Sequence, residues 1–277
     1  MESLPLVSIC IACYNAASTI EATLKSVLAQ TYANIEIVVN DNQSTDHTAE
    51  IVRSFENNRI KLYVNSINIG MVRNFEAALS KTSGEYVKLL CADDLLTPDC
   101  IEKEVLVFIN HPNDNIVAVT AEKYVINEVG KKLFVKKYPG GKGVHNGLKA
   151  IKKSLRYGTN IFGEPGCLLY RKSAILQAGG IVIPDELTYV FDLDLTCRVL
   201  KFGNLYVIKE PLFLFRIIAS SFTSNSRWKQ VSVFDAWVNH IEKKMIHLSW
   251  FDKKVAFVSS WLICLARNFV LTVVNKK

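Results

Sequence analysis

The chain has 277 residues, 49% of them hydrophobic, which is enough to bury a sizeable core and excludes a disordered protein. The formal net charge of +7 is moderate and scattered, so it suits anionic ligands or an anionic membrane surface, and we predict no nucleic-acid partner. The seven cysteines form no compact framework and the start MESLPLVS lacks the parts of a signal peptide, so we expect a reduced, cytoplasmic protein.

The first half of the sequence alternates short β-rich runs with amphipathic helical segments. Thr45 or Asp46 is the expected N-cap of the second helix, and Thr97, followed by Pro98, is that of the fourth. This alternation predicts an α/β fold with a mostly parallel sheet that helices cover on both faces. Strands are predicted at residues 7–13, 35–40, 60–64, 86–91 and 116–121, and helices at about 18–30, 46–55, 72–81 and 98–108.

Polar residues follow four of these strands, at the point where each strand ends. Ligands of such sheets bind beyond the carboxyl ends of the strands, so we expect the four loops to converge on one crevice. For the second and third loops alone, ordinary turn chemistry is the favoured explanation. The loops contain Tyr14 and Asn15, then NDNQSTD at 40–46, NSINIG at 65–70 and ADD at 92–94.

The fourth loop holds the adjacent carboxylates Asp93 and Asp94. Two neighbouring carboxylates at a strand end repel each other unless a cation or a proton joins them. A divalent metal that bridges to a phosphate removes this repulsion. Because Mg²⁺ and Mn²⁺ accept hard oxygen ligands, a few waters and substrate phosphates, we predict a Mn²⁺ or Mg²⁺ site here.

These segments together resemble a known family. The run VSICIACYNAASTIEATLKSVLAQTYANIEIVVNDNQSTDHTAEIV, followed by GEYVKLLCADD, closely resembles the inverting family-2 glycosyltransferases, which have the Rossmann-like GT-A fold. The resemblance is strong over roughly the first 120 residues and weaker up to about Arg216. It implies a nucleoside-diphosphate sugar as the donor, bound in the predicted crevice.

The resemblance also implies donor-binding residues. Ala12, Tyr14 and Asn15 would line the donor site, the first two around the base. Asp41 would accept a hydrogen bond from the base or the ribose, and Arg73, in GMVRN, would help to hold the nucleoside.

The acidic pair stands where the family has its DxD-type motif. By this resemblance Asp94 is the direct metal ligand, and Asp93 contacts the ribose or a metal-bound water. The segment LFLFRIIASSFTS, at 212–224, resembles a later family element, but Ile218 stands where histidine is often found. Arg216 then either takes over part of the charge neutralisation of the donor or is a salt-bridged structural arginine.

The second half departs from regular alternation, as an acceptor-binding half would. The segment FGEPGCLLYRKSAI, at 162–175, resembles a family loop and strand on the acceptor side, and its Glu164 is a candidate acceptor contact or support. A helix is predicted from about Val190 to a C′ residue at Gly203, and a strand follows at 204–208.

Asp192 and Asp194 lie in or near the first turn of that helix, where the macrodipole favours negative charge. From local physics they are simply two helix-start acids, with Arg198 solvated. The run nevertheless resembles the family element ED-Y-D-L-W-L-R, with Phe191 in place of the usual Glu. The resemblance implies that Asp192 is the catalytic base, and that Asp194 and Arg198 contact the acceptor or support the site.

The tail from Phe251 to Lys277 has about 20 residues between lysine pairs, near the length of a membrane span. Polar residues inside it argue against spanning, namely Ser259, Ser260, Arg267 and Asn268. We expect an amphipathic helix that either packs on the catalytic domain or lies in the membrane interface, and packing is favoured.

The sequence thus predicts a GT-A domain with a nucleotide-sugar-binding half at 1–120, an acceptor-binding half at 121–225 and a helical C-terminal extension at 226–277. The implied activity is inverting, metal-dependent transfer of a sugar to a hydroxyl of a glycan or lipid-linked acceptor in surface polysaccharide synthesis. It would occur in the cytoplasm, with possible peripheral contact to the inner face of the cell membrane. The alternatives are a non-catalytic sugar-nucleotide-binding or scaffolding subunit of an envelope-assembly complex, and a nucleotidyltransferase.

Overall fold

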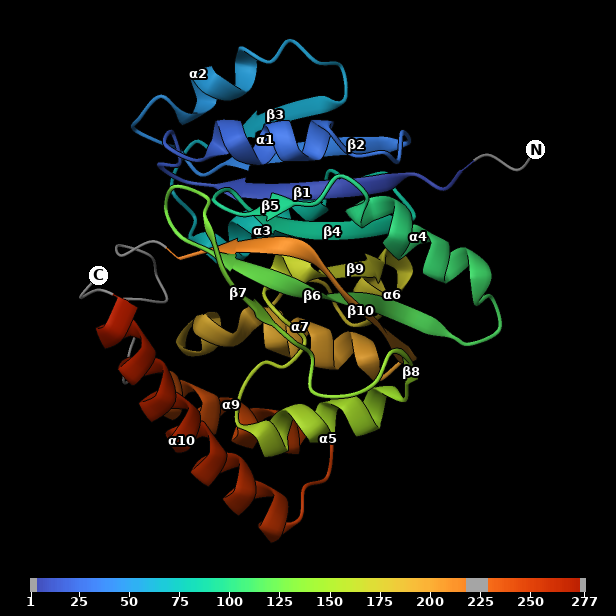
Figure 1. The fold of residues 1–277 in the computed structure, drawn as a ribbon, viewed down its shortest axis with the longest axis vertical. Coiled ribbons are helices and arrows are strands. Elements are labelled where there is room, and N and C mark those ends of the chain that lie inside the picture. The colour runs from blue at the N-terminus through green and yellow to red at the C-terminus, as the bar shows by residue number, and fades with distance from the viewer. Residues whose placement is uncertain (1–3, 218–228, 275–277) are drawn as a thin grey trace.

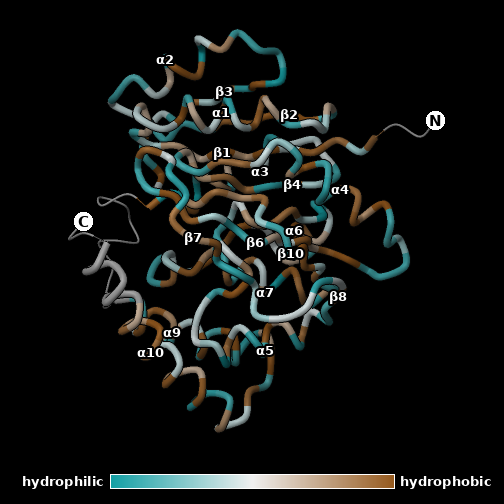
Figure 2. Tube along the Cα trace, in the orientation of Figure 1, coloured by the Kyte–Doolittle hydropathy of each residue, from teal (hydrophilic) through white to brown (hydrophobic). Residues whose placement is uncertain are grey.

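A mixed β-sheet runs through the middle of the molecule, with helices on both of its faces (Figure 1). This structure is a computed structural model that describes residues 4–217 and 229–274. The strands lie in the order β3-β2-β1-β4-β9-β6-β10-β5, with β7 beside β6 and β8 beside β10. Figure 2 shows hydrophobic residues concentrated along the central strands, which supply much of the buried core.

The first strands of the chain are parallel and lie where the sequence predicts them. β1 pairs with both β2 and β4, and β2 pairs with β3, so their carboxyl ends share one edge of the sheet. β1 and β2 are buried along almost their whole length, which explains why their sequences are continuous apolar runs rather than alternating ones. The bounds are Val7–Cys13 (β1), Ile35–Asp41 (β2), Ile60–Val64 (β3) and Tyr86–Cys91 (β4).

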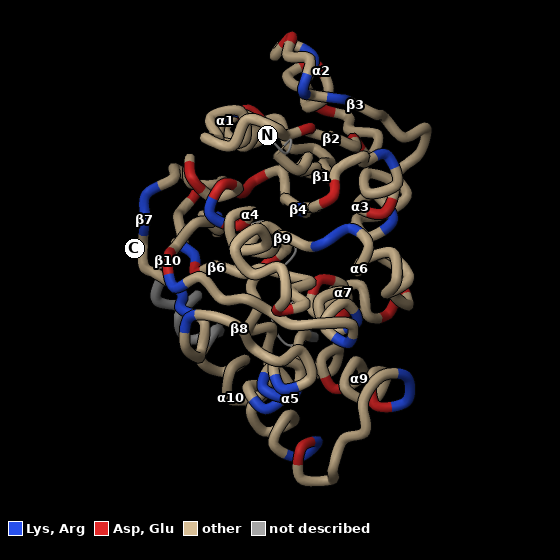
Figure 3. Tube along the Cα trace, turned by 90° about the vertical axis from the view of Figure 1, so that its right-hand side faces the viewer, with Lys and Arg blue, Asp and Glu red and all other residues tan. Residues whose placement is uncertain are grey.

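The helices of this half lie on opposite faces of the sheet, α1 and α4 on one and α3 on the other (Figure 3). The first three are shorter than predicted, and α4 is shifted by two residues toward the C-terminus. Their bounds are Ile20–Leu28 (α1), Thr48–Arg53 (α2), Met71–Leu79 (α3) and Cys100–Asn110 (α4).

The predicted N-caps of α2 and α4 are wrong. The N-cap of α2 is His47, and Asp46 instead accepts the backbone N–H of Thr48 at 3.0 Å. The N-cap of α4 is Asp99, and the Thr97 hydroxyl donates to its carboxylate at 2.9 Å, in a turn before the helix. In both places a short polar side chain bonds within a local turn, which moves the start of the helix.

The second half of the chain completes the sheet with strands of both directions. β6 and β10 are parallel, whereas β9 lies between β4 and β6 and is antiparallel to both. Because β6 continues through residue 120, the two predicted halves share one sheet, and the division between them stays a prediction. The bounds are Leu95–Leu96 (β5), Ile116–Ile126 (β6), Lys132–Lys136 (β7), Gly143–His145 (β8), Leu168–Arg171 (β9) and Asn204–Arg216 (β10).

The second half of the chain contains the helix that the sequence predicts from about Val190, which is α7 in the structure. The prediction that Gly203 is its C′ residue is wrong, because the helix ends at a right-handed C-cap, Lys201. Glycine is needed at 203 for a close approach, since a Cβ there would lie 2.4 Å from the carbonyl oxygen of Asn115. The bounds are Gly147–Tyr157 (α5), Pro165–Cys167 (η1), Lys172–Gln177 (α6), Asp185–Val190 (η2) and Phe191–Leu200 (α7).

The C-terminal region is helical, as predicted. It consists of α9, Lys229–Lys244, and α10, Trp250–Val274. α10 packs on α5 and α9, and α9 packs on η2 at the end of the molecule away from β3 (Figure 1). No helix in the described part of the chain is long and apolar enough to cross a membrane.

Candidate functional site

The loops that follow β1 and β2 are joined at the carboxyl edge of the sheet. The backbone N–H of Asn15 donates to Ser44 Oγ at 2.9 Å, and that of Thr45 donates to Asn15 Oδ1 at 2.8 Å. Asn15 has a φ of 49°, in the left-handed region that asparagine adopts more readily than most residues. These contacts confirm that the first two loops converge.

Asp41, the last residue of β2, is buried and is fixed by its own loop. Ser44 Oγ donates to Asp41 Oδ1 at 2.5 Å, and the Ser44 N–H donates to Oδ2 at 2.9 Å. The Cys13 thiol also donates to Oδ1 at 3.5 Å. Because a carboxylate oxygen can accept more than one hydrogen bond, Oδ2 keeps the capacity to accept another from a ligand.

The other predicted donor residues lie along the same edge. Tyr14 is 49% exposed just beyond β1, and Ala12 is partly buried near the end of that strand. Arg73, in the first turn of α3, reaches the carboxylate of Asp185 in η2 at 3.5 Å. Arg73 therefore links this edge to the segment that leads into α7.

A network of buried and partly buried asparagines joins the loops after β2 and β3 to α3, and sequence reasoning missed it. Asn40 Nδ2 donates to Asn65 Oδ1 at 2.9 Å and to Asn74 Oδ1 at 2.7 Å. Asn65 Nδ2 donates to Asn42 Oδ1 at 2.9 Å, and the Lys81 ammonium donates to Asn40 Oδ1 at 3.0 Å. Turn chemistry therefore explains these two loops only in part. The signal was the repeated asparagine in both.

Asp93 and Asp94 form an acidic cluster with Cys91, at the end of β4. One ligand atom from each residue lies within 4.8 Å of the others, and Asp94 is buried. Burial raises the pKa of Asp94 well above its ordinary value, and the charge of Asp93 raises it further. Burial likewise raises the pKa of Asp93. Two desolvated carboxylates that repel each other fit a Mn²⁺ or Mg²⁺ ion, which prefers oxygen ligands. The Cys91 thiol does not add to this fit, because sulfur is a soft donor and burial raises the pKa of Cys91 well above its ordinary value.

Arg216, at the end of β10, holds the acidic loop in place. Its backbone N–H donates to Asp94 Oδ1 at 2.9 Å, and its Nε donates to the Asp93 carbonyl at 2.8 Å. Nη1 donates to the carbonyl of Glu128 at 2.6 Å, in the turn between β6 and β7. Any contact with a donor would be additional to this structural role. The predicted departure at Ile218 lies outside the described residues.

Asp192 lies in the first turn of α7 and is partly buried. Its Oδ2 accepts from Asn160 Nδ2 at 2.8 Å, and its Oδ1 accepts from the Leu193 N–H at 2.8 Å. Burial raises the pKa of Asp192 to about 6, although these hydrogen bonds and the charge of Lys123 oppose the shift. Burial is the largest cause of the raised pKa of Cys91, and the charges of Asp94, Asp93 and Asp192 raise it further. Asp192 therefore lies near the acidic cluster.

Lys123, on β6, is a buried cation among these acids that sequence reasoning also missed. It forms an ion pair with the carboxylate of Glu164, the predicted acceptor-side residue that precedes η1. Its charge opposes the upward pKa shifts of both Asp94 and Asp192. The available signal was a charged residue inside a strand that is otherwise largely apolar.

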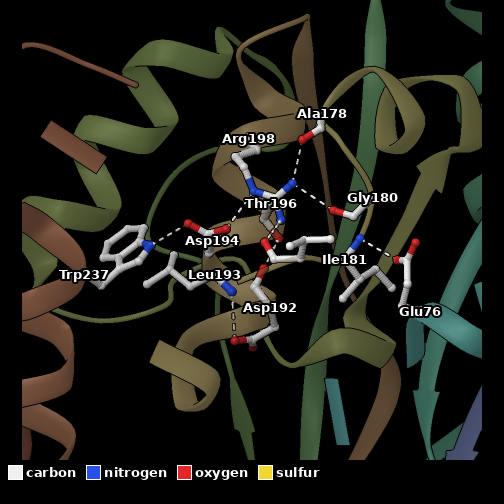
Figure 4. A network of polar contacts seen from close by, with 11 residues as sticks. Glu76, Ala178, Gly180, Ile181, Asp192, Leu193, Asp194, Thr196, Arg198 and Trp237 are labelled. Atoms are coloured by element: carbon white, nitrogen blue, oxygen red, sulfur yellow. Dashed lines mark hydrogen bonds and ion pairs between the residues drawn. The ribbon is translucent and has the colours of Figure 1, made fainter. Parts of the chain in front are cut away.

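Asp194 points to the opposite side of α7 from Asp192 (Figure 4). Arg198 Nε donates to Asp194 Oδ2 at 2.7 Å, and Trp237 Nε1, on α9, donates to Oδ1 at 3.0 Å. Arg198 Nη1 also donates to the carbonyl of Ala178 at 2.6 Å. The solvated Arg198 expected from local physics is therefore wrong, because the pair joins α7 to α9 and to the loop after α6.

Known proteins resemble this chain in sequence. The model of glycosyl transferase family 2 matches residues 8–178. An uncharacterized glycosyltransferase of Haemophilus influenzae is 34% identical over 221 residues, which cover 78% of this chain and 67% of that protein. The UDP-Glc:alpha-D-GlcNAc-diphosphoundecaprenol beta-1,3-glucosyltransferase WfgD of Escherichia coli is 36% identical over 129 residues, covering 46% of this chain and 50% of WfgD.

Solved structures resemble the chain in fold. S. aureus TarS 1–349 in complex with UDP-GlcNAc has a TM-score of 0.70 at 17% identity, covering 92% of this chain and 71% of that one. The mannosyltransferase PcManGT from Pyrobaculum calidifontis, in complex with GDP-Man and Mn²⁺, has a TM-score of 0.61 at 18% identity. The match covers 94% of this chain and 70% of that one. At these identities the likeness shows the fold alone, and it confirms the predicted GT-A architecture.

Proposed function

The chain belongs to glycosyl transferase family 2 and is a glycosyltransferase, and on this premise we propose that it transfers a sugar from a nucleoside-diphosphate sugar to a hydroxyl group, with inversion. The observation behind the proposal is that an acidic cluster at Asp93–Asp94 lies near a second carboxylate, Asp192, whose pKa is raised to about 6. Inverting transfer needs both groups, one to hold a cation at the leaving diphosphate and one to deprotonate the attacking hydroxyl.

On the donor side, Asp94 would bind the metal ion, and Asp93 would contact the ribose or a metal-bound water. When bound, Mn²⁺ or Mg²⁺ would neutralise the charge that develops on the leaving diphosphate. Structures of the same fold have been solved with UDP-GlcNAc and with GDP-Man and Mn²⁺, which supports this class of donor. The residues proposed to hold the donor are Ala12, Tyr14, Asn15, Asp41, Arg73 and Arg216.

On the acceptor side, Asp192 would act as the general base. Its carboxylate takes the proton of the acceptor hydroxyl while the hydroxyl oxygen attacks the anomeric carbon, and the diphosphate leaves with the electron pair of the broken bond. The hydrogen bonds from Asn160 and Leu193 orient the carboxylate. A pKa of about 6 leaves Asp192 ionised at neutral pH but still basic enough to accept a proton.

Three further residues would support this base. Glu164, paired with Lys123, would border the acceptor. Asp194 and Arg198 would fix α7 and thereby the position of Asp192, since their contacts are with α9 and with the loop after α6. In this scheme residues 1–120 bind the donor, residues 121–225 bind the acceptor, and residues 226–277 form a helical extension.

For the acceptor we propose a lipid-linked sugar of surface polysaccharide synthesis, at the cytoplasmic face of a membrane. The support is the relative WfgD, whose name specifies transfer to alpha-D-GlcNAc-diphosphoundecaprenol.

The test is a screen of the purified protein against UDP-, GDP- and dTDP-sugars, with a short-chain GlcNAc-diphospho-lipid as acceptor and with or without Mn²⁺. We expect one donor to give a metal-dependent product with inverted anomeric configuration by NMR. A product with retained configuration, or full activity in excess EDTA, would contradict the mechanism. Donor binding without turnover would indicate a scaffolding subunit. Release of pyrophosphate in a parallel assay with a nucleoside triphosphate and a sugar 1-phosphate would indicate a nucleotidyltransferase.

A further inference from the structure

The helix α10 rests on the rest of the protein with a polar and small-residue face. Its buried residues recur every fourth position at Asp252, Ala256, Ser260 and Cys264. This spacing defines one side of an α-helix. The side is unusual for an amphipathic helix, because a carboxylate and a hydroxyl lie inside where apolar side chains are expected.

The contact of this face with α5 is close and specific. Arg156 Nε donates to Asp252 Oδ1 at 3.0 Å, which ties the end of α5 to the start of α10. Gly158, the left-handed C-cap of α5, approaches α10 so closely that a Cβ would lie 2.2 Å from the Ser260 backbone nitrogen. The orientation of α10 about its own axis is therefore fixed.

The outer face of α10 is apolar and exposed. Its residues recur at the spacing of one helix face, and each leaves a large fraction of its surface in water. Phe257 and Trp261 also contact each other edge to face, with ring centroids 6.5 Å apart. The exposed fractions are Trp250 68%, Phe251 62%, Phe257 46%, Val258 54%, Trp261 42%, Leu262 61% and Leu265 50%.

Basic residues lie on the neighbouring helix α5 and on α10 itself. On α5 the positions at helical spacing, Lys149, Lys152, Lys153 and Arg156, are all basic and at least partly exposed. Figure 3 shows these charges gathered on α5, the helix against which α10 packs. On α10 itself, Lys254 lies over the ring of Trp250, with Nζ 4.5 Å from the centroid.

We propose that this face, Trp250 to Leu265 with the basic stripe of α5, is a docking surface for an anionic lipid bilayer. An exposed apolar helix face beside lysines, with tryptophans on it, matches the chemistry of the interface between headgroups and acyl chains. The basic residues complement the negative surface of such a membrane. Monomeric proteins rarely expose large contiguous apolar patches, so an apolar stripe of this kind indicates a surface that binds another molecule or a membrane.

Docking would bring the proposed catalytic site close to the membrane. This consequence rests on the proposed function, because it assumes a lipid-linked acceptor. The strands β1, β2 and β4 end at the left of Figure 1, and α10 rises toward that same side. A bilayer against α10 would therefore lie near the edge where Asp94 and Asp192 are found. The acceptor sugar could then reach the crevice while its lipid stays in the membrane.

The experiment is sedimentation of the full chain with vesicles of 30% phosphatidylglycerol in phosphatidylcholine, and with pure phosphatidylcholine. We expect binding to the anionic vesicles, with a blue shift of the fluorescence of the exposed Trp250 and Trp261. The double variant Phe257→Gln/Leu262→Gln should bind roughly tenfold more weakly or worse, since each side chain loses apolar burial. Lys149→Gln/Lys152→Gln should reduce binding to the anionic vesicles.

The matched control is Leu106→Gln/Leu176→Gln, on α4 and α6. These leucines are 44% and 60% exposed, close to the values for the residues changed in the test. The control should bind like the wild type. Equal binding by the test variant, or no binding by the wild type, would overturn the proposal.

A second copy of the chain is the competing occupant of this face. A wild-type dimer that dissociates in Phe257→Gln/Leu262→Gln, without any vesicle, would assign the face to that copy and overturn membrane docking. Transfer to a water-soluble acceptor, measured in parallel, should be unchanged in this variant. If no donor supports transfer in any variant, the proposed reaction fails while the vesicle result still decides the docking.

Discussion

Two aspartates on opposite sides of α7 have different hydrogen-bond partners. On the side of the acidic cluster Asp192 is held by an amide and a backbone N–H, has no charged partner in hydrogen-bond contact among the residues that the structure describes, and has its pKa raised to about 6. On the far side Asp194, two residues later, is buried against the guanidinium of Arg198 and the indole of Trp237. Both are aspartates in the first turn of one helix.

The difference shows how a structural acid can be told from a candidate reactive one. A buried carboxylate that is paired with arginine stays ionised and can stabilise packing, although breaking such a pair is costly. A desolvated carboxylate held only by neutral donors is left nearer to protonation, which is costly for stability and useful for proton transfer. Asp94 belongs with Asp192 by this criterion, because burial also raises its pKa.

The largest effect on the side of the acidic cluster is expected from Asp94→Asn. Loss of the proposed metal ligand at the leaving group should lower transfer on the order of 10⁴-fold, since such a metal supplies several kcal/mol of stabilisation. Mn²⁺ should raise the Tm of the wild type but not that of the variant.

The metal-free stability supplies the control for this prediction. The folded pKa of Asp94 is raised, so its ionisation costs stability as pH rises through that value. Asp94→Asn removes this cost and should not lower the metal-free Tm at pH 7.5. A large loss of Tm would mean that the activity was lost through misfolding instead.

The comparison across α7 is tested most directly by Asp192→Asn. Removing the proposed general base should lower kcat roughly 10²–10⁴-fold and leave donor affinity nearly unchanged. In the wild type, kcat should fall below about pH 6, where the raised pKa leaves Asp192 protonated, and this acid limb should vanish in the variant. Near-normal turnover for Asp192→Asn beside a collapse for Asp194→Asn would reverse the assignment.

The far side of α7 should respond in stability. Asp194→Ala leaves Arg198 without its carboxylate and breaks the bond to Trp237, so we expect a loss of about 3–5 kcal/mol in the free energy of unfolding. Denaturant titration measures this loss. Activity per folded molecule should fall much less than in Asp192→Asn, because Asp194 acts only through the position of α7, whereas an unchanged stability would show that the network is dispensable.

The smallest effect expected is a shift in pH dependence from Lys123→Met. The Lys123 charge opposes the raised pKa of Asp192, so its removal should move the acid limb of kcat upward, on the order of one pH unit. Lys123→Arg keeps the charge and should restore the wild-type midpoint. If Lys123→Met leaves the midpoint unmoved, Lys123 serves only to hold Glu164.

The sequence predicted the first half of the fold well, because its signals are local. β1, β3 and β4 have the predicted bounds, since continuous apolar runs between helical segments mark buried parallel strands. The convergence of loops at one sheet edge followed from that topology, and the joined loops of Asn15 and Ser44 agree with it. The asparagine network was missed because turn chemistry accounts for the same residues one loop at a time.

The second half of the fold depended more on contacts between distant residues. The position of β9 between β4 and β6, antiparallel to both, has no signature in its four residues. The Lys123–Glu164 pair joins positions 41 residues apart, which no local pattern reports. Gly203 was misassigned because its constraint comes from the backbone of Asn115 and not from its own helix end.

By itself the sequence determined the α/β class, the strand-end loops, the acidic pair and two candidate acids at the start of one helix, because apolar periodicity and residue chemistry are read along the chain. It also contained the amphipathic pattern of the tail. Only the tertiary structure decided that Asp192 lies near the acidic cluster while Asp194 faces Arg198 and Trp237, and that the apolar face of α10 points to water. The physical reason is that periodicity fixes which residues share a face of a helix, whereas the packing of distant elements fixes what that face meets.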